Sequence, residues 1–301
     1  MHEYKGTYSQ YKTSRAKDEE RLAKVAVMQA KEIARLQTVV DRFGAKATKA
    51  AMAHSKEKQI ARLESQRVEV GPGDRTLRVR FPDPPSCGAT VVTATHLSKA
   101  YGGPPVFEDV DFDLGRGERL LVLGLNGAGK TSLLRILAGE TTANLGDFHF
   151  GHNVSAGYYA QEHDNLRTDQ NLLDNIRAEV PPGVIYTETQ LRALLGMMGL
   201  SGDKVRQSSG TLSGGEKTKL ALAMLMVGRN NLLLLDEPTN NLDPPSREAV
   251  ADALSDWKGS IVFVSHDTEF VERLSPTKVL LMPDGQVDYF NDDWLELVTL
   301  A

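Results

Sequence analysis

The octapeptide GLNGAGKT, at residues 124–131, constrains the fold of this chain more than any other stretch. It fits the pattern G-x-x-x-x-G-K-[ST], with the apolar run RLLVL directly before it and the helical pattern SLLRIL directly after it. In such a strand–loop–helix unit, glycines let backbone N–H groups close around phosphates, and the helix presents its positive end to them. The context therefore predicts a phosphate-binding loop in an α/β fold, and a chance Gly-rich turn is the alternative.

The loop also predicts which groups would meet a nucleotide. Lys130 would reach the β and γ oxygens, and the Thr131 hydroxyl would bind Mg²⁺. ATP and Mg²⁺ are therefore the expected cofactors. The expected ATP contacts in and beside the loop are Gly124, Leu125, Asn126, Gly127, Ala128, Gly129, Lys130, Thr131 and Ser132.

A second motif, NLLLLDEP at residues 231–238, predicts the other half of the site. Its apolar run indicates a buried strand that ends in Asp236, which is suited to hold the metal together with Thr131. Glu237 follows at the strand tip, where a carboxylate could orient or deprotonate an attacking water. The alternative is a core strand that ends in a capping acid.

Strand-like and helical patterns alternate over the C-terminal part of the chain. The runs VVTA, RLLVLG, NLLLLD and SIVFVS are separated by helical segments such as 131–138 and 215–227. Continuous apolar strands separated by helices indicate a largely parallel sheet covered on both faces. The expected fold class is an α/β P-loop NTPase.

The N-terminal part has a different pattern. Residues 12–43 contain no Pro or Gly, and apolar or small residues recur at spacings of four and three, from Leu22 to Phe43. This periodicity predicts a coiled-coil helix. Gly44 would break it before a second helix over residues 45–68, giving an antiparallel hairpin. One continuous helix through Gly44 is the alternative.

These patterns divide the chain into a hairpin at 12–69, a Pro- and Gly-rich connector at 70–89 and an α/β domain at 90–301. The connector holds the only cysteine, Cys87, so no intramolecular disulfide can form and a reducing compartment is expected. No apolar run approaches the roughly 20 residues of a membrane span. We therefore expect a cytoplasmic protein without a membrane-spanning segment.

Charge is distributed unevenly. Lys and Arg outnumber Asp and Glu by 14 to 8 over residues 12–69, whereas acids outnumber bases by 31 to 20 over residues 70–301. The excess lies near the predicted turn, and RNA phosphates would favour it. The expected nucleic-acid contacts are Arg42, Lys46, Lys49 and Lys56. An ordinary solvated coiled coil is the alternative.

Three further motifs follow the Gly-rich loop in a fixed order: LSGGE at 212–216, DEPTNNLD at 236–243 and VSHD at 264–267, with Gln161 ahead of them. The set resembles the nucleotide-binding domain of an ATP-binding-cassette (ABC) protein over residues 90–290. The resemblance implies that Tyr101 stacks on adenine, that Gln161 senses the metal and γ-phosphate, and that His266 contacts the γ-phosphate. Glu237, His266 and Gln161 are then the catalytic residues, and Thr131, Gln161 and Asp236 the metal ligands.

The same resemblance implies a paired assembly. Leu212, Ser213, Gly214, Gly215 and Glu216 form the signature that would cap ATP bound to a partner cassette, and Asp243 lies in the loop that communicates between the pair. Since the chain has one Gly-rich loop and one signature, a second cassette is an expected partner. That cassette is either a missing N-terminal half or the other subunit of a homodimer.

Within the ABC proteins the chain resembles the ABC-F family, which has two cassettes joined by a helical hairpin that enters the ribosome near tRNA. RFGAKATKA at 42–50, LSGGEKTKLALA and the roughly 50 residues between Gln161 and Leu212 carry this resemblance. Residues 1–11 resemble the end of a first cassette, so we expect a hairpin linker plus second cassette. A natural half-length homodimer is the alternative.

The resemblance implies an ATPase that contacts rRNA and tRNA on the ribosome, either to regulate translation or to confer antibiotic resistance. Two alternatives remain open. One is a DNA-associated ABC ATPase in repair or transposon excision. The other is the ATP-binding subunit of a membrane transporter, which would give the basic hairpin no role.

Overall fold

The computed structural model describes residues 79–161 and 165–300, together with Met28, Ile33, residues 35–37, residues 58–59 and Leu77. The chain divides into two compact units, Met1–Arg75 and Thr76–Ala301. In the first unit the few described residues are helical, and Leu36 is buried. The predicted tail 1–11, the hairpin turn and the proposed nucleic-acid contacts Arg42, Lys46, Lys49 and Lys56 lie outside the described residues.

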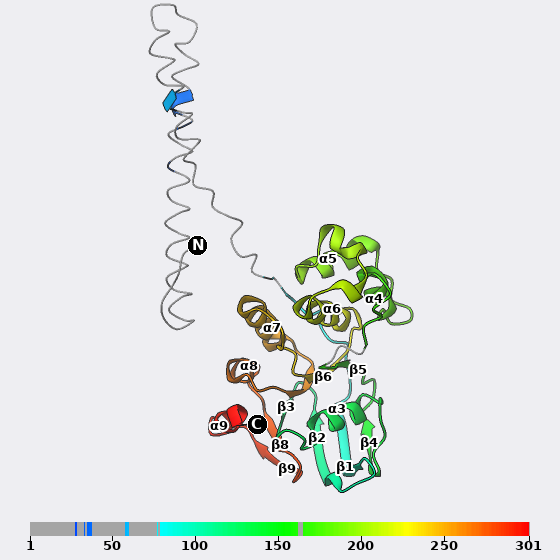
Figure 1. The fold of residues 1–301 in the computed structure, drawn as a ribbon. Coiled ribbons are helices and arrows are strands. Elements are labelled where there is room, and N and C mark those ends of the chain that lie inside the picture. The colour runs from blue at the N-terminus through cyan, green and yellow to red at the C-terminus, as the bar shows by residue number, and fades with distance from the viewer. Residues whose placement is uncertain are drawn as a thin grey trace, which may run out of the picture. The chain divides into compact units, whose positions relative to one another are not determined.

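A six-stranded sheet forms the centre of the second unit (Figure 1). Its strands lie in the order β5-β6-β7-β3-β8-β9, and all neighbours are parallel except β8 and β9. The strands are β3 (Arg119–Leu123), β5 (Ala156–Tyr159), β6 (Leu232–Asp236), β7 (Ser260–Val264), β8 (Lys278–Leu281) and β9 (Gln286–Tyr289). Every residue of β6 and β7 is buried, which confirms the prediction that their apolar runs lie inside a covered parallel sheet.

Alternate residues of β6 belong to two different cores. Leu233 and Leu235 point into a cluster with α6 (Gly214–Val227), α7 (Pro244–Asp256) and α8 (Thr268–Leu274). Leu232 and Leu234 point into a second cluster with α3 (Lys130–Leu137). Because successive side chains of a strand alternate between faces, helices cover both sides of the sheet.

A separate three-stranded antiparallel sheet completes the second cluster. It has the order β2-β1-β4, from β1 (Thr90–Ala100), β2 (Pro105–Gly115) and β4 (Leu145–Phe150). The expectation of one largely parallel sheet is therefore wrong for VVTA, which lies in β1. The register of β1 against β2 shifts at several positions, and buried side chains of β1 pack in one cluster with those of α3.

A helical region follows β5 and ends with the longest helix of the second unit. It contains α4 (Leu172–Ala178), α5 (Glu188–Met197), the short 3₁₀ segments η2 (Gly202–Arg206) and η3 (Ser209–Thr211), and α6. In Figure 1, α4, α5 and α6 gather at one end of the second unit and β1, β2 and β4 at the other. The chain ends in α9 (Trp294–Leu300).

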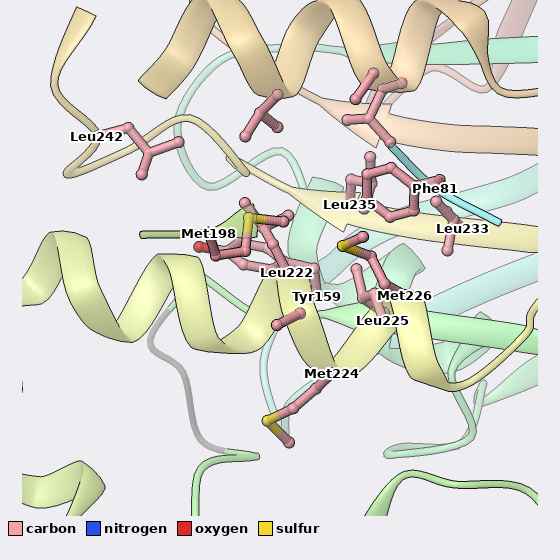
Figure 2. Packing of buried hydrophobic residues seen from close by; sticks show 14 of the residues in the cluster. Phe81, Tyr159, Met198, Leu222, Met224, Leu225, Met226, Leu233, Leu235 and Leu242 are labelled. Atoms are coloured by element: carbon pink, nitrogen blue, oxygen red, sulfur yellow. The ribbon is translucent and has the colours of Figure 1, made fainter. Parts of the chain in front are cut away.

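The connector is anchored to the second unit at its C-terminal end. Phe81 packs its ring 6.3 Å from that of Trp257, and the Trp257 indole N–H donates to the Pro82 carbonyl at 3.0 Å. Figure 2 shows Phe81 beside Leu233 and Leu235 of β6, in the cluster that also contains buried side chains of α6. The end of the connector is thus part of the larger core.

Candidate nucleotide site

The central sheet places the Gly-rich loop and the acidic motif at the same edge. The loop leaves the carboxyl end of β3 and enters α3, while Asp236 ends the parallel strand β6. Ligands of open α/β sheets bind outside the carboxyl ends of the strands, where loops from neighbouring strands converge.

Two glycines of the loop are required by close contacts as well as by backbone conformation. Gly129 has φ 90°, and a Cβ there would lie 2.7 Å from Cδ1 of Phe107. Gly124 has φ 152°, and a Cβ there would collide with the Met282 carbonyl oxygen. Since residues with a side chain rarely adopt these φ values, the tight path of the loop depends on glycine.

A pocket of about 320 Å³ opens over this loop. Two of its lining residues, Val106 and Val264, were not predicted as site residues. Its predicted members come from five separate stretches of the chain: Tyr101, Leu125, Asn126, Gly127, Gly129, Lys130, Thr131, Ser132, Gln161, Asp236, Glu237 and His266. Gly124 and Ala128 belong to the loop but do not line the pocket.

Lys130 is buried at the start of α3. Its ammonium donates to the Gly124 carbonyl and, at 3.2 Å, to the Leu125 carbonyl. Burial lowers the pKa of Lys130, and the nearby carboxylates of Glu237 and Asp236 oppose that effect. A phosphate would offer this ammonium stronger, charged acceptors than the loop carbonyls do.

Asp236 and Thr131 fit a divalent cation. Burial raises the pKa of Asp236, and a hydrogen bond from the Thr131 hydroxyl opposes that effect. Among the described residues, the buried Oδ2 atom of Asp236 has no hydrogen-bond partner. A buried carboxylate oxygen without a partner, next to a hydroxyl, is the oxygen-rich donor set that Mg²⁺ prefers.

Glu237 is held in an unusual conformation at the tip of β6. Its φ is 53°, a value that is strained for a residue with a side chain, and only 4% of its surface is exposed. Burial raises the pKa of Glu237 to about 7, and the adjacent Asp236 carboxylate adds to this. A carboxyl group that titrates near neutral pH can accept a proton from water.

His266 lies against Glu237. Its backbone N–H donates to Glu237 Oε2 at 3.4 Å, and its Nε2 lies 3.1 Å from Oε1 without hydrogen-bond geometry. Burial lowers the pKa of His266, and the positive charge of Lys130 lowers it further. A neutral imidazole near neutral pH is the expected state of this side chain.

The signature residues lie outside this pocket, at the start of α6. Ser213 caps the helix: its hydroxyl accepts from the Glu216 N–H at 3.4 Å, and its own N–H donates to Glu216 Oε2 at 3.0 Å. Hydrogen bonds from Lys204 and then from the Ser213 N–H hold the pKa of Glu216 at about 2. Leu212 is buried, while Ser213 and Gly214 are exposed.

Asp243 is the N-cap of α7. It accepts from the Ser246 hydroxyl at 2.6 Å and from the Lys219 ammonium at 3.1 Å. Burial acts to raise the pKa of Asp243, but these hydrogen bonds outweigh it and the pKa lies below the ordinary value. Lys219 comes from α6, so this pair links the signature helix to the loop before α7.

Two family models, both described as ABC transporter, match residues 107–240 and residues 1–81. The putative ATP-binding protein YdiF of Bacillus subtilis is 37% identical over 97% of this chain and 45% of its own length. The probable ATP-binding protein YheS of Haemophilus influenzae is 38% identical over 97% of this chain and 46% of its own. ABC transporter F family member 2 of Arabidopsis thaliana is 32% identical over 96% and 42%. The chain spans about half the length of these curated relatives.

Solved structures agree on the fold. The dimeric post-hydrolysis structure of the ATP-binding cassette MJ0796, bound to ADP and Pi, matches with a TM-score of 0.58. It covers 66% of this chain and 99% of its own, at 20% identity, so it supports the fold alone. None of the helices among the described residues is long and apolar enough to cross a membrane.

The fold and the pocket define an ATP-binding cassette of the P-loop NTPase class, as predicted. The relatives make the assignment finer: the chain belongs to the ABC-F family.

Proposed function

We propose that this chain binds and hydrolyses ATP as part of an ABC-F protein that acts on the ribosome. The observation that carries the ATPase part is the convergence of Lys130, Thr131, Asp236, Glu237 and His266 on one pocket. Together they offer a cation for phosphates, oxygen donors for a metal, and a carboxyl group that titrates near neutral pH.

Each residue has a distinct part in hydrolysis. Lys130 and the loop N–H groups hold the β- and γ-phosphates. Thr131 and Asp236, with Gln161, would hold Mg²⁺, which when bound neutralises phosphate charge. Glu237 orients a water for attack on the γ-phosphate and accepts its proton, while His266 contacts the γ-phosphate.

Full activity requires a second cassette. Ser213 and Gly214 are exposed and do not line the pocket of their own chain, so they are free to meet ATP bound to a partner. The MJ0796 cassette is described as dimeric with ADP and Pi bound. The partner here is either a preceding cassette of the same protein or a second copy of this chain.

The ribosomal role rests on charge and family. The basic excess of residues 12–69 favours a polyanion, and the hairpin residues Arg42, Lys46, Lys49 and Lys56 would contact rRNA or tRNA to regulate translation or protect the ribosome. Such a protein acts in the cytoplasm. A DNA-associated ATPase in repair or transposon excision would use the same charge, whereas a transporter subunit would not need it.

Charge reversal of the hairpin tests the ribosomal part. Replacing Arg42, Lys46 and Lys49 with Glu should abolish co-sedimentation with ribosomes in ATP while leaving ATP binding intact. The matched control replaces Arg80, Arg206 and Lys258, three exposed cations of the second unit, with Glu. This variant should bind ribosomes normally. Equal ribosome binding by both triple variants would contradict the proposed role. If the hairpin variant instead lost binding to duplex DNA and kept binding to ribosomes, the DNA-associated alternative would be favoured.

A further inference from the structure

Lys99 is a buried lysine at the end of β1, beside the aromatic residue of the nucleotide pocket. Only 7% of its surface is exposed, and its ammonium lies 4.8 Å from the centroid of the Tyr101 ring. Its hydrogen-bond acceptors are neutral: the Thr142 carbonyl at 2.6 Å and the Thr141 hydroxyl at 3.1 Å. Because neither acceptor is an anion, neither offsets the ammonium charge that faces the ring.

Tyr101 itself is exposed and yet held at two points. Its surface is 63% exposed and it lines the nucleotide pocket. Its hydroxyl donates to the Ser132 hydroxyl at 3.1 Å, at the start of α3. The Lys99 ammonium covers one face of the ring. An exposed aromatic side chain would otherwise sample several rotamers, so these two contacts fix both its tip and its plane.

The anchors of Lys99 belong to the loop that follows α3. In that loop Asn144 accepts from the Ala100 N–H through Oδ1 at 2.8 Å and donates its own N–H to the Ser98 carbonyl at 2.8 Å. The end of β1 is thus tied to the loop after α3, while Tyr101 is tied to the start of the same helix. Because α3 begins with Lys130 and Thr131, the ring is placed relative to the phosphate-binding loop.

We propose that Lys99 is a positioning residue for the nucleotide base. Its ammonium fixes the Tyr101 ring from behind, so that a flat heteroaromatic base stacks on the opposite face while the phosphates occupy the loop. This inference rests on the proposed ATP-binding function and adds a residue to it. A ring that is already ordered lowers the entropic cost of base binding, and a cation on its rear face favours an electron-rich base on the front.

The test compares a ligand that has a base with one that does not. Lys99→Met keeps an unbranched side chain, one atom shorter, and removes its charge. It should weaken Mg²⁺-ATP binding by about fivefold and leave the binding of Mg²⁺-tripolyphosphate unchanged. Lys99→Arg should restore ATP binding, because a guanidinium also stacks on an aromatic ring. An unchanged affinity for ATP, or an equal loss for both ligands, would overturn the proposal.

Two controls separate this role from a general effect on folding. Combined with Tyr101→Ala, Lys99→Met should cost no further ATP affinity, whereas additive losses would show that Lys99 acts without the ring. Thr141→Val removes one anchor of the ammonium with little change in shape, and should give a smaller loss confined to ATP. Wild-type protein that binds neither ligand would instead contradict the proposed function itself.

Discussion

Replacing Glu237 with Gln probes the most perturbed carboxyl group of the site. The amide has nearly the same size as a protonated carboxyl group, so packing is preserved while ionisation is removed. Burial, and then the charge of Asp236, raises the pKa of Glu237 from 4.5 to about 7 in the folded protein. The substitution should therefore leave stability at low pH nearly unchanged and should raise stability, relative to wild type, at higher pH.

The sign and size of the effect follow from linkage. Below pH 4.5 the carboxyl group is protonated in both the folded and the unfolded chain, and Gln and Glu should be equivalent. As the pH rises from 4.5 to 7, the unfolded wild-type chain loses its proton first, so wild-type stability falls. A pKa change of this size corresponds to about 3 kcal/mol above pH 7. For a unit of this length that is about 6–12 °C in Tm.

Thermal unfolding in EDTA, without nucleotide, measures this directly. The Tm of Glu237→Gln minus that of wild type should be near zero at pH 4, where both chains are mostly protonated, and should rise until about pH 7. Glu108→Gln, at an exposed position of β2, is the matched control and should follow the wild-type profile. A constant difference between Glu237→Gln and wild type at all pH values would contradict the raised pKa of Glu237, because Glu237 would then keep one charge state throughout.

Further predictions concern the loop, the connector and the signature. Gly129→Ala should destabilise the protein by about 1–3 kcal/mol, because the new methyl meets Phe107 at a left-handed φ. Gly196→Ala in α5, where a Cβ has open space, should stabilise it by about 0.5–1 kcal/mol, and chemical denaturation compares the two. Phe81→Ala should cost about 3–5 kcal/mol in the same assay, as expected for a buried ring. Glu216→Gln should flatten the loss of stability between pH 4.5 and 2, since the pKa of Glu216 is held at about 2 in the folded state and acid titration removes that contribution.

The parts of the fold that were predicted well carry strong local signals. The strands β6 and β7 are continuous apolar runs, which only a sheet covered on both faces accommodates. The predicted helix 131–138 differs from α3 by one residue at each end, and the predicted helix 215–227 starts one residue after α6 does. The agreement is close because a Gly-rich loop and a Ser–Glu capping box define where these helices start.

The parts that were missed depend on tertiary contacts. VVTA is a strand, as predicted, but whether a strand joins a parallel or a separate antiparallel sheet is decided by its partners. The alternation in PVFEDVDFDLG was the available signal, since β2 buries every second residue over much of its length. Nothing local in the sequence marks Lys99 as buried beneath an aromatic ring, because a lysine is expected on the surface.

The sequence predicted most of the residues that line the pocket, but not their pKa values. The ordered motifs give the residues that line the pocket, but the raised pKa of Glu237 comes from burial among segments far apart in the chain. The roles of the pocket residues, of Asp243 and the signature, and of the basic hairpin residues stay predictions, since each acts on a ligand or partner.

We propose that ATP controls the engagement of this protein with the ribosome. The most direct measurement is co-sedimentation of Glu237→Gln protein with ribosomes, because a cassette that binds ATP without hydrolysing it should accumulate in its closed state. Recovery with ribosomes should be high with ATP and low without nucleotide or with ADP. Equal recovery with and without ATP, or no recovery at all, would show that ATP does not control ribosome binding by this protein.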